Sequence, residues 1–410
     1  MDWEIKNVTV VSPQQVESKA SIFIKGHKIA AVGRHIKIDE EVISIDCNGL
    51  LAFPGFINCH DHLLGTYWPR VGDRRPYLNW LEWDNDLKSS PLYTERQQID
   101  SQDLYQMGGY RHLLCGVTSV QDHIPHFVRE LFGKEVPIRI ISKYGLAHSV
   151  TSFALNWGEG IEKEHNLAKE NNIPFITHCS EGFDEETIRS VETLHRRGAL
   201  SKQTVLIHGI AFSDSDIDLL AEYGCHVVWC PVSNLYMFSR TAPVKKLLEK
   251  NVNVVLGTDS PMSGSINLFE ELRVAQAYFA QAYGQKLSEK TLLQMVTTQA
   301  ARAMCLHELG EIAENKWADI VLIDGDPKDP YQAFANMDYE HIRLVVLNGR
   351  PKYASEEFIQ VFEAMKIPYQ KILVAGHRKI VDGDILGLLA RVRKAVKFHK
   401  ILDFLPVEPW

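Results

Sequence analysis

The sequence predicts an α/β fold with a parallel sheet in the middle of the chain and antiparallel strands toward both ends. The first observation is that short apolar runs alternate with helical stretches from Leu51 to Leu256, as in successive βαβ units. The second is that runs outside this region alternate between apolar and polar residues, as half-buried strands do. With 410 residues, 45% of them hydrophobic, the chain can build one large domain or several smaller ones of roughly 150 residues each.

The elements are expected in the following order. Antiparallel strands come first, at 5–11, 20–24, 28–32 and 42–45. The apolar runs of the middle region predict strands at 52–58, 117–121, 138–142, 173–177, 205–207, 226–229 and 252–256. Strand-like segments return at 318–323 and 342–347, so both ends of the chain are expected to share one small sheet domain. From about Ser355 the pattern is helical, and residues 385–399 form a basic amphipathic helix, which more commonly packs on its own protein than on a membrane.

Composition and charge exclude several classes of function. Lys and Arg number 44 against 52 for Asp and Glu, so the chain lacks the basic field that drives nucleic-acid binding. No apolar run approaches the length of a transmembrane helix, and the first residues do not resemble a signal peptide. The seven cysteines are widely spaced and odd in number, which indicates reduced, mostly buried thiols. We therefore expect a cytoplasmic protein without membrane or nucleic-acid partners.

The residues that carry chemistry stand at the ends of predicted strands. His60 and His62 end the strand that begins near Ala52, and period two places both imidazoles on one face. His178 and His208 end two further strands, and Asp259 follows a fourth. Histidine nitrogens with one carboxylate suit Zn²⁺ or Fe²⁺ and leave a coordination position for water, which is typical of a catalytic metal site.

Several longer motifs carry a resemblance to a known family. They are residues 54–62 (PGFINCHDH), 177–182 (THCSEG), 230–235 (CPVSNL), 256–261 (LGTDSP), 267–273 (NLFEELR) and 316–324 (KWADIVLID). In this order they resemble the amidohydrolase superfamily, and more narrowly its aminohydrolase branch of triazine chlorohydrolases and heterocycle deaminases. The resemblance implies a (β/α)8 TIM-type barrel over residues 54–305, with a β-sandwich from residues 1–53 and 306–354. A helical extension over residues 355–410 completes the predicted organisation.

The resemblance also implies a role for each site residue. One divalent metal ion, zinc in the first place with iron or manganese as alternatives, would be held by His60, His62, His178 and Asp259. Glu181 would shuttle protons to the ring nitrogen and the leaving amine, His208 would orient the attacking water, and Asp259 would take its proton. Substrate contacts are expected from His148, Asn234 and Trp68.

The implied reaction is hydrolytic deamination of a nitrogen heterocycle, a purine, pyrimidine or triazine. Displacing an amine from an aromatic ring requires a strong nucleophile and a general acid for the ring nitrogen, which metal-activated water and Glu181 would supply. The same ligands would also serve hydrolysis of an amide, lactam or carbon–halogen bond, because they set the nucleophile and not the leaving group. A catalytically inactive barrel scaffold is a third hypothesis, but it predicts missing ligands and none is missing.

Two stretches depart from the family pattern. About 15 residues separate His123 from Ile138 and about 20 separate His148 from Ile173, so one βα unit is shortened or missing. His148 then lies on either the third or the fourth strand of the barrel. Nearby Lys143 has the alternative role of a carboxylated lysine bridging two metals, although the Glu181 pattern belongs to the mononuclear branch. Gln121, Asp122 and His123 are expected to line the pocket.

The loop 64–87 is rich in aromatic residues and arginine, including Arg70, Arg74 and Arg75. It is suited to stack a planar ring and clamp an anionic group. Because Trp, Tyr and Arg are also enriched at protein interfaces, a contact in a homo-oligomer is the equal alternative.

Overall fold

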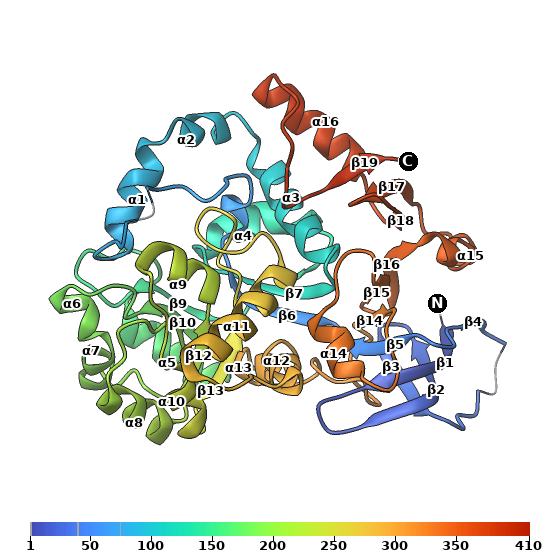
Figure 1. Ribbon diagram of the computed structural model, residues 1–410, viewed down its shortest axis with the longest axis horizontal. Helices are drawn as coiled ribbons and strands as arrows, with labels where there is room; N and C mark the ends of the chain where they lie inside the picture. The colour runs from blue at the N-terminus through green and yellow to red at the C-terminus, as the bar shows by residue number, and fades with distance from the viewer. Residues whose placement is uncertain (1, 39–40, 74) are drawn as a thin grey trace.

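In the computed structural model, which describes residues 2–38, 41–73 and 75–410, both ends of the chain contribute to one sheet (Figure 1). This sheet has eleven strands among the described residues, in the order β19-β17-β18-β16-β15-β14-β5-β1-β2-β3, with β4 paired to β1. Its strands are β1 (Trp3–Val11), β2 (Val16–Lys25), β3 (Lys28–Gly33), β4 (Ile43–Asp46), β5 (Leu51–Pro54), β14 (Ile320–Ile323), β15 (Ile342–Leu347), β16 (Arg350–Ser355), β17 (Gln370–Val374), β18 (His377–Val381) and β19 (Val407–Pro409).

The junction between the two ends of the chain is the antiparallel pair β5 and β14, in which Phe53 lies opposite Val321. Both strands are fully buried, which explains their continuous apolar sequences. The two ends of the chain therefore meet in one sheet.

The middle of the chain forms parallel strands. A three-stranded sheet contains β6 (Phe56–Asp61), β7 (Val117–Asp122) and β8 (Arg139–Ile140). A five-stranded sheet contains β9 (Gly145–Ser149), β10 (Phe175–Cys179), β11 (Thr204–His208), β12 (His226–Trp229) and β13 (Asn253–Leu256). A parallel bridge between Asp61 and Asp259 brings the end of β6 beside the residues that follow β13. The carboxyl ends of strands distant in the sequence thus meet at one place.

Helices separate most of these strands and cover their outer side (Figure 1). α11 shows how such a helix is specified, since the side chain of Asn267 accepts a hydrogen bond from the Glu270 amide at its first turn. The helices are η1 (Leu63–Gly65), α1 (Trp80–Ser89), α2 (Pro91–Arg96), α3 (Ser101–Leu113), α4 (His126–Phe132), η2 (Gly133–Glu135), α5 (Ile161–Asn171), α6 (Glu185–Ile188), α7 (Ser190–Arg196), α8 (Asp214–Tyr223), α9 (Pro231–Phe238), α10 (Val244–Glu249), α11 (Leu268–Tyr283), α12 (Glu289–Met295), α13 (Thr298–Ala303), α14 (Pro330–Ala335), η3 (Glu356–Phe358), α15 (Ile359–Ala364) and α16 (Ile385–Val396).

Gly55 marks the point at which the chain passes from the eleven-stranded sheet to the parallel strands. The predicted strand 52–58 is divided there into β5 and β6. A Cβ atom at Gly55 would lie 2.3 Å from Oγ1 of Thr118 in β7. Only glycine allows this close approach, so β6 follows β5 directly and packs against β7.

The shortened βα unit predicted near His148 is found between β8 and β9. β8 has only two residues, and residues 141–144 connect it to β9 without a helix. His148 lies on β9, the fourth parallel strand in chain order, which resolves the alternative left open by the sequence. Lys143 is exposed in the connecting segment and takes no part in the site described below.

Residues 355–410 differ from the predicted helical extension. Besides α15 and α16 they contain β17, β18 and β19, which extend the eleven-stranded sheet. The hairpin of β17 and β18 was missed because its strands are short and rich in Lys, Arg and Gln, with only Ile372, Val374, Ile380 and Val381 as buried apolar residues. The basic helix α16 packs against α3, where Arg391 pairs with Asp103 at 2.9 Å.

Two further expectations concern the environment of the chain. All seven cysteines are free, and every one except Cys305 is buried, as predicted. Within the described ranges, no helix has both the length and the apolar composition needed to cross a lipid bilayer.

Candidate metal centre and active site

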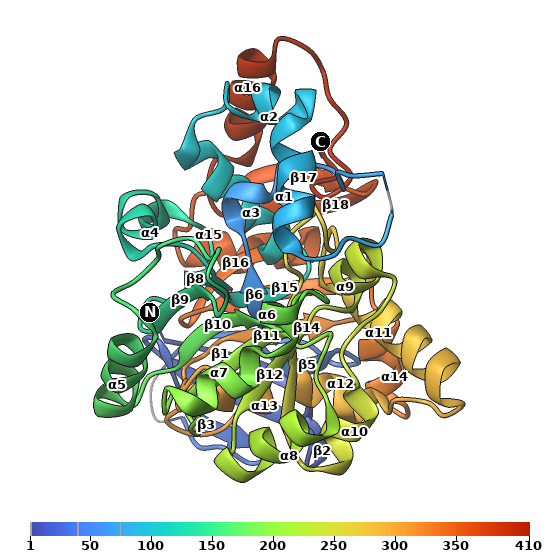
Figure 2. The ribbon, with the colours of Figure 1, turned by 90° about the vertical axis from the view of Figure 1, so that its left-hand side faces the viewer.

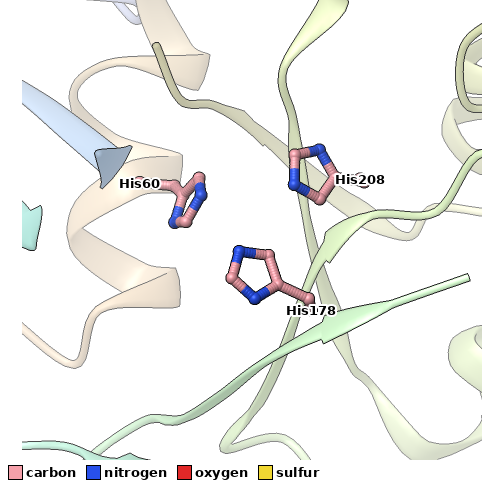
Figure 3. A group of neighbouring side chains, drawn as sticks. All are labelled: His60, His178 and His208. Carbon is pink, nitrogen blue, oxygen red and sulfur yellow. The ribbon is translucent and has the colours of Figure 1, made fainter. Parts of the chain in front are cut away.

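Four histidines and one aspartate converge where the parallel strands end. His60 lies in β6, and His178 and His208 lie in β10 and β11. His62 directly follows β6, and Asp259 is the third residue after β13. The imidazoles of His60, His178 and His208 point toward one another from three strands (Figure 3). The possible ligand atoms of these three residues lie within 4.8 Å of one another, as do those of His60, His62 and Asp259. His60 belongs to both groups, so the described residues offer one joined cluster that could hold a metal ion.

The outer nitrogens of three imidazoles are fixed by hydrogen bonds. Nδ1 of His62 donates to the carbonyl oxygen of His123 at 3.0 Å, and Nδ1 of His178 donates to that of His148 at 2.6 Å. Nδ1 of His208 donates to Oδ1 of Asn234 at 2.8 Å. These bonds leave each Nε2 as a free lone pair facing the cluster, which is the arrangement that supports metal-binding histidines in general.

His60 provides the test of whether a metal fits. Its side chain is fully buried, and neither ring nitrogen has a hydrogen-bond partner among the described residues. A buried imidazole without partners is costly unless another group satisfies it. A divalent ion beside His60 Nε2 would do so, and the nitrogen and carboxylate donors match the preferences of zinc.

The two oxygens of Asp259 have different partners. Oδ1 lies 3.2 Å from Nε2 of His60 and 3.5 Å from Nε2 of His62. Oδ2 accepts hydrogen bonds from the hydroxyls of Ser233, at 2.5 Å, and Ser263, at 2.8 Å. Burial opposes ionisation of this carboxyl, but the nearby His60, at 3.2 Å, and the other histidines of the cluster hold its pKa well below the usual range. Asp259 is therefore a carboxylate, with Oδ1 turned toward the cluster.

Glu181 is a second carboxyl in the same site with the opposite tendency. Its Oε1 lies 3.5 Å from Nε2 of His208. Burial and the negative charge of Asp259 raise the pKa of Glu181 well above its ordinary value. Glu181 therefore lies in a desolvated environment that favours its neutral form. Two carboxyls whose environments separate their pKa values are a common sign of acid and base roles.

The backbone at these strand ends is strained. Ser180, His208 and Asp259 have φ angles of 52°, 74° and 60°, in the left-handed region that residues other than glycine rarely adopt. Gly257 permits the close approach of this segment to β6, because a Cβ atom there would lie 2.8 Å from Cβ of His60. Such strain persists only where the surroundings enforce it, and it concentrates at functional sites.

A buried ionic network lies behind the cluster. Asp61 alternates with His60 and His62, so its side chain points to the other side of β6, where it is fully buried. It accepts hydrogen bonds from Nη2 of Arg111 at 2.6 Å and from Oγ1 of Thr258 at 2.5 Å. Burial opposes the charge of Asp61, but the Arg111 guanidinium holds the pKa of this carboxyl well below its usual range. The network ties β6 to the residue that precedes Asp259.

Arg111→Met is expected to lower the free energy of unfolding by about 3–5 kcal/mol, because it leaves the buried Asp61 carboxylate without a counter-ion. Denaturant unfolding of the metal-free protein measures this loss. The double variant Asp61→Leu with Arg111→Met should recover most of it, since neither charge is then buried alone. An Arg111→Met protein as stable as the wild type would contradict the assignment.

A cavity of about 300 Å³ opens onto the cluster at His62, His178, Glu181 and Asp259. Its volume is at the lower end of the range typical of small-molecule sites. Its outer walls come from α1, α2 and the loops beside them, which lie on the same side of the molecule as α16 (Figure 2). The aromatic residues that line it are Trp68, Trp80, Trp83, Tyr93 and Trp157.

Of the three expected substrate contacts, two line the cavity and one does not. Trp68 and His148 line the cavity. Asn234 does not, because it is fully buried and its amide is occupied by His208 on one side and Thr241 on the other. Asn234 therefore orients His208, which corrects its expected role as a substrate contact.

Other expected pocket residues also need revision. Gln121, Asp122 and His123 are fully buried beneath the cluster and do not line the cavity. Tyr105 donates a hydrogen bond to Asp122, and His123 packs with its ring centroid 4.4 Å from that of His178. These residues support the site from below.

Sequence reasoning missed two groups of functional residues. Trp157 and Arg96 line the cavity from a loop and from α2, with no motif to indicate them. Ser233 and Ser263 hold Asp259. Ser233 belongs to the motif of residues 230–235, and its position next to Asn234 was the only sequence feature that indicated a role in the site.

Glu271 in α11 is a buried carboxyl outside the cavity, and it provides a test of the electrostatics around the site. Its Oε1 accepts a hydrogen bond from the Val232 amide at 3.2 Å, and burial raises its pKa to about 8. Between pH 5 and pH 8 the unfolded chain releases this proton while the folded protein retains it. The free energy of unfolding should therefore fall as pH rises, by at most about 1.4 kcal/mol per pH unit.

Glu271→Gln is expected to remove this dependence, so that the variant gains stability over the wild type as pH rises from 5 to 8. Denaturant unfolding at pH 5, 6.5 and 8 measures the difference. The exposed Glu222→Gln on α8 serves as control and should follow the wild-type curve. Equal pH dependence of wild type and Glu271→Gln would rule out a protonated Glu271.

Comparison with known proteins identifies a family model and relatives that match this chain. The sequence model of the family described as "Amidohydrolase family" matches residues 147–352. A "5-methylthioadenosine/S-adenosylhomocysteine deaminase" of Caldicellulosiruptor saccharolyticus is 25% identical over 422 residues, covering 88% of this chain and 96% of that protein.

Two solved structures share the fold at 20% identity. An adenosine deaminase from Xanthomonas campestris with bound zinc superposes with a TM-score of 0.76, covering 97% of this chain and 98% of that one. An atrazine chlorohydrolase from Arthrobacter aurescens, in complex with zinc, superposes with a TM-score of 0.73, covering 96% of this chain and 100% of that one.

Proposed function

This chain belongs to the amidohydrolase family, and from that membership we propose that it is a metal-dependent hydrolase that removes an amino group from a nitrogen heterocycle. The observation that carries the proposal is the pairing of a histidine and aspartate cluster with a buried carboxyl, Glu181, which lies beside His208 and whose pKa is raised by burial and by Asp259. Relatives of similar length are named as deaminases. The expected substrate is a small purine, pyrimidine or triazine.

His60, His62, His178 and Asp259 are proposed to hold one divalent ion, zinc in the first place, with iron or manganese as alternatives. When bound, such an ion lowers the pKa of a coordinated water from 15.7 to roughly 7. Support comes from the free Nε2 atoms of His62 and His178, the unpartnered His60 and the Oδ1 atom of Asp259 that faces them.

The protein groups divide the proton transfers of deamination between them. Asp259 is ionised and accepts a proton from the attacking water. Glu181 donates its proton to the ring nitrogen, which relieves the loss of aromaticity. The proton that Asp259 has taken from the water then passes through the Glu181 carboxylate to the departing amine, and the remaining hydroxyl proton returns to Glu181 as the carbonyl forms. His208 is held by Asn234, with Nε2 3.5 Å from Oε1 of Glu181, and in this position it would orient the attacking water. Burial lowers the pKa of His208 to about 4, so it acts as a neutral hydrogen-bonding group.

We also infer that the strands β6–β13 form one (β/α)8 barrel over residues 54–305, closed where the Asp61–Asp259 bridge joins its first and last strands. Residues 1–53 and 306–354 would then form the companion β domain, extended by the strands of residues 370–409. The free thiols favour a reducing compartment such as the cytoplasm.

Ammonia release from a panel of aminated purines, pyrimidines and triazines tests the proposed function. The wild-type protein loaded with zinc is expected to release ammonia from at least one of them and to leave cyclic amides unchanged. Hydrolysis of a lactam, or release of chloride from a chlorotriazine without ammonia from any amine, would instead support the alternative with the same ligands. No turnover of any of these compounds by the zinc-loaded protein would overturn the proposal.

A further inference from the structure

The arginines of loop 64–87, which the sequence offered as an anion clamp, are not available for that role. Arg70 pairs with Glu270 at 2.6 Å. Arg75 pairs with Asp73 at 2.6 Å and with Asp86 at 3.0 Å. Neither residue lines the cavity, and Arg74 lies outside the described residues. If the site binds an anionic group, another cation must provide the charge.

Arg96, near the end of α2, has the properties that the loop arginines lack. It lines the cavity, and no carboxylate of the described residues lies within ion-pair distance of it. Its acidic neighbour Glu95 is already occupied by Lys400, at 2.7 Å, and by the Tyr67 hydroxyl. Arg96 is therefore a half-buried cation whose charge the protein does not neutralise, and burial lowers its pKa.

The guanidinium of Arg96 is held in place by neutral groups. Nε and Nη2 both donate to the carbonyl oxygen of Leu64 at 3.3 Å. The guanidinium carbon lies 5.3 Å from the ring centroid of Trp68, which in turn stacks on Tyr93. These contacts fix the side chain but use only two of its five N–H groups, so Nη1 remains for a ligand.

Arginine only donates hydrogen bonds. A ligand that uses the remaining N–H groups of Arg96 must therefore present acceptors, and a neutral acceptor would leave the charge of Arg96 uncompensated.

We propose that the heterocycle accepted by this site carries an anionic oxygen group, a carboxylate or a phosphate, that binds Arg96 in the outer part of the cavity. This inference rests on the proposed function, because it names a substituent on the same substrate. The ring would lie at the cluster, between His148 and Glu181, while the anionic group extends toward α2. Charge-assisted hydrogen bonds of this kind are the strong ones in proteins.

Kinetics with three adenosine derivatives test the inference. The zinc-loaded wild type is compared on 5'-deoxyadenosine, which is uncharged, on adenosine 5'-monophosphate, which carries a phosphate, and on S-adenosylhomocysteine, which carries a carboxylate beside an ammonium group. We expect kcat/KM to be at least about 10-fold higher for one of the two compounds with an anionic group, and the preferred compound identifies that group. Arg96→Gln should lower that kcat/KM by about 10–100-fold, mainly through KM, and change the value for 5'-deoxyadenosine by less than about 3-fold.

Arg75→Gln is the matched control, because it removes an arginine that is exposed and paired outside the cavity. It should leave all three values near those of the wild type. Quenching of tryptophan fluorescence by each nucleoside gives affinities without turnover and should show the same loss in Arg96→Gln.

The outcomes separate the inference from the proposed function. Suppose that the wild type releases ammonia but has its highest kcat/KM for the uncharged nucleoside, or that Arg96→Gln lowers kcat/KM equally for all three compounds. The proposed anion site is then wrong, while the proposed deaminase function stands. If no aminated heterocycle releases ammonia, the proposed function fails, and the inference falls with it. Restoration of anion preference by Arg96→Lys would show that charge, and not the shape of the guanidinium, is recognised.

Discussion

Glu181→Gln is expected to reduce turnover by about 10²–10⁴-fold while the metal content stays near one ion per chain. Glu181 lies 3.5 Å from His208 and its pKa is raised by burial and by Asp259, so it holds the proton that the ring nitrogen requires. Glutamine keeps the shape and the neutral charge of the protonated acid but cannot transfer a proton. Steady-state kinetics with metal analysis of the same preparation measures both quantities.

The matched control is Glu185→Gln, the same change four residues along the chain, where the side chain is 88% exposed. It should keep turnover within about 2-fold of the wild type, as expected for a surface substitution. If Glu181→Gln retained full turnover, the proton would have to come from another group, and the assignment of Glu181 would be wrong. A loss of metal in this variant would instead place Glu181 among the ligands.

His178→Ala is expected to weaken metal binding by more than about 100-fold, because it removes a ligand, whereas loss of an outer hydrogen bond alone costs about 10–100-fold. His178 lies at the centre of the cluster, with its ring centroid 5.0 Å from that of His60 and 5.3 Å from that of His208. Chelator competition followed by elemental analysis measures the affinity, and ammonia release should fall in parallel.

His226→Ala provides the comparison for this variant. His226 is also a buried histidine on a parallel strand, but it begins β12, at the end of the strand remote from the cluster, and donates to the carbonyl oxygen of Lys202. It should reduce stability and leave metal binding unchanged. Equal metal content in His178→Ala and the wild type would show that His178 is not a ligand.

The convergence of the cluster could be predicted from the sequence because each member ends an apolar run. Parallel strands place their carboxyl ends together, so His60, His178, His208 and Asp259 were expected at one site before any tertiary contact was known. The strained φ angles of His208 and Asp259 were not accessible in this way. They arise from packing across strands, which local sequence does not record.

The C-terminal hairpin of β17 and β18 and the cavity residue Arg96 show why other parts of the fold and the site could not be predicted from the sequence. β17 and β18 are built from long polar residues around a few apolar ones, so their pairing depends on β16 and β19 rather than on their own pattern. Arg96 is one arginine among many in the sequence, and its lack of an acidic partner appears only when Glu95 is seen bound to Lys400. Whether an arginine has an acidic partner depends on tertiary contacts, so it cannot be predicted from the sequence.

Gly55 has a consequence for exchanging parts between related enzymes. Only four residues separate this glycine from His60, and β5 before it is hydrogen-bonded to β1 and β14, which come from opposite ends of the chain. A chimera that grafts the catalytic half onto a foreign β domain would therefore disturb the anchoring of His60 and His62. Recombination of such proteins should preserve β1, β5 and β14 as one inherited block.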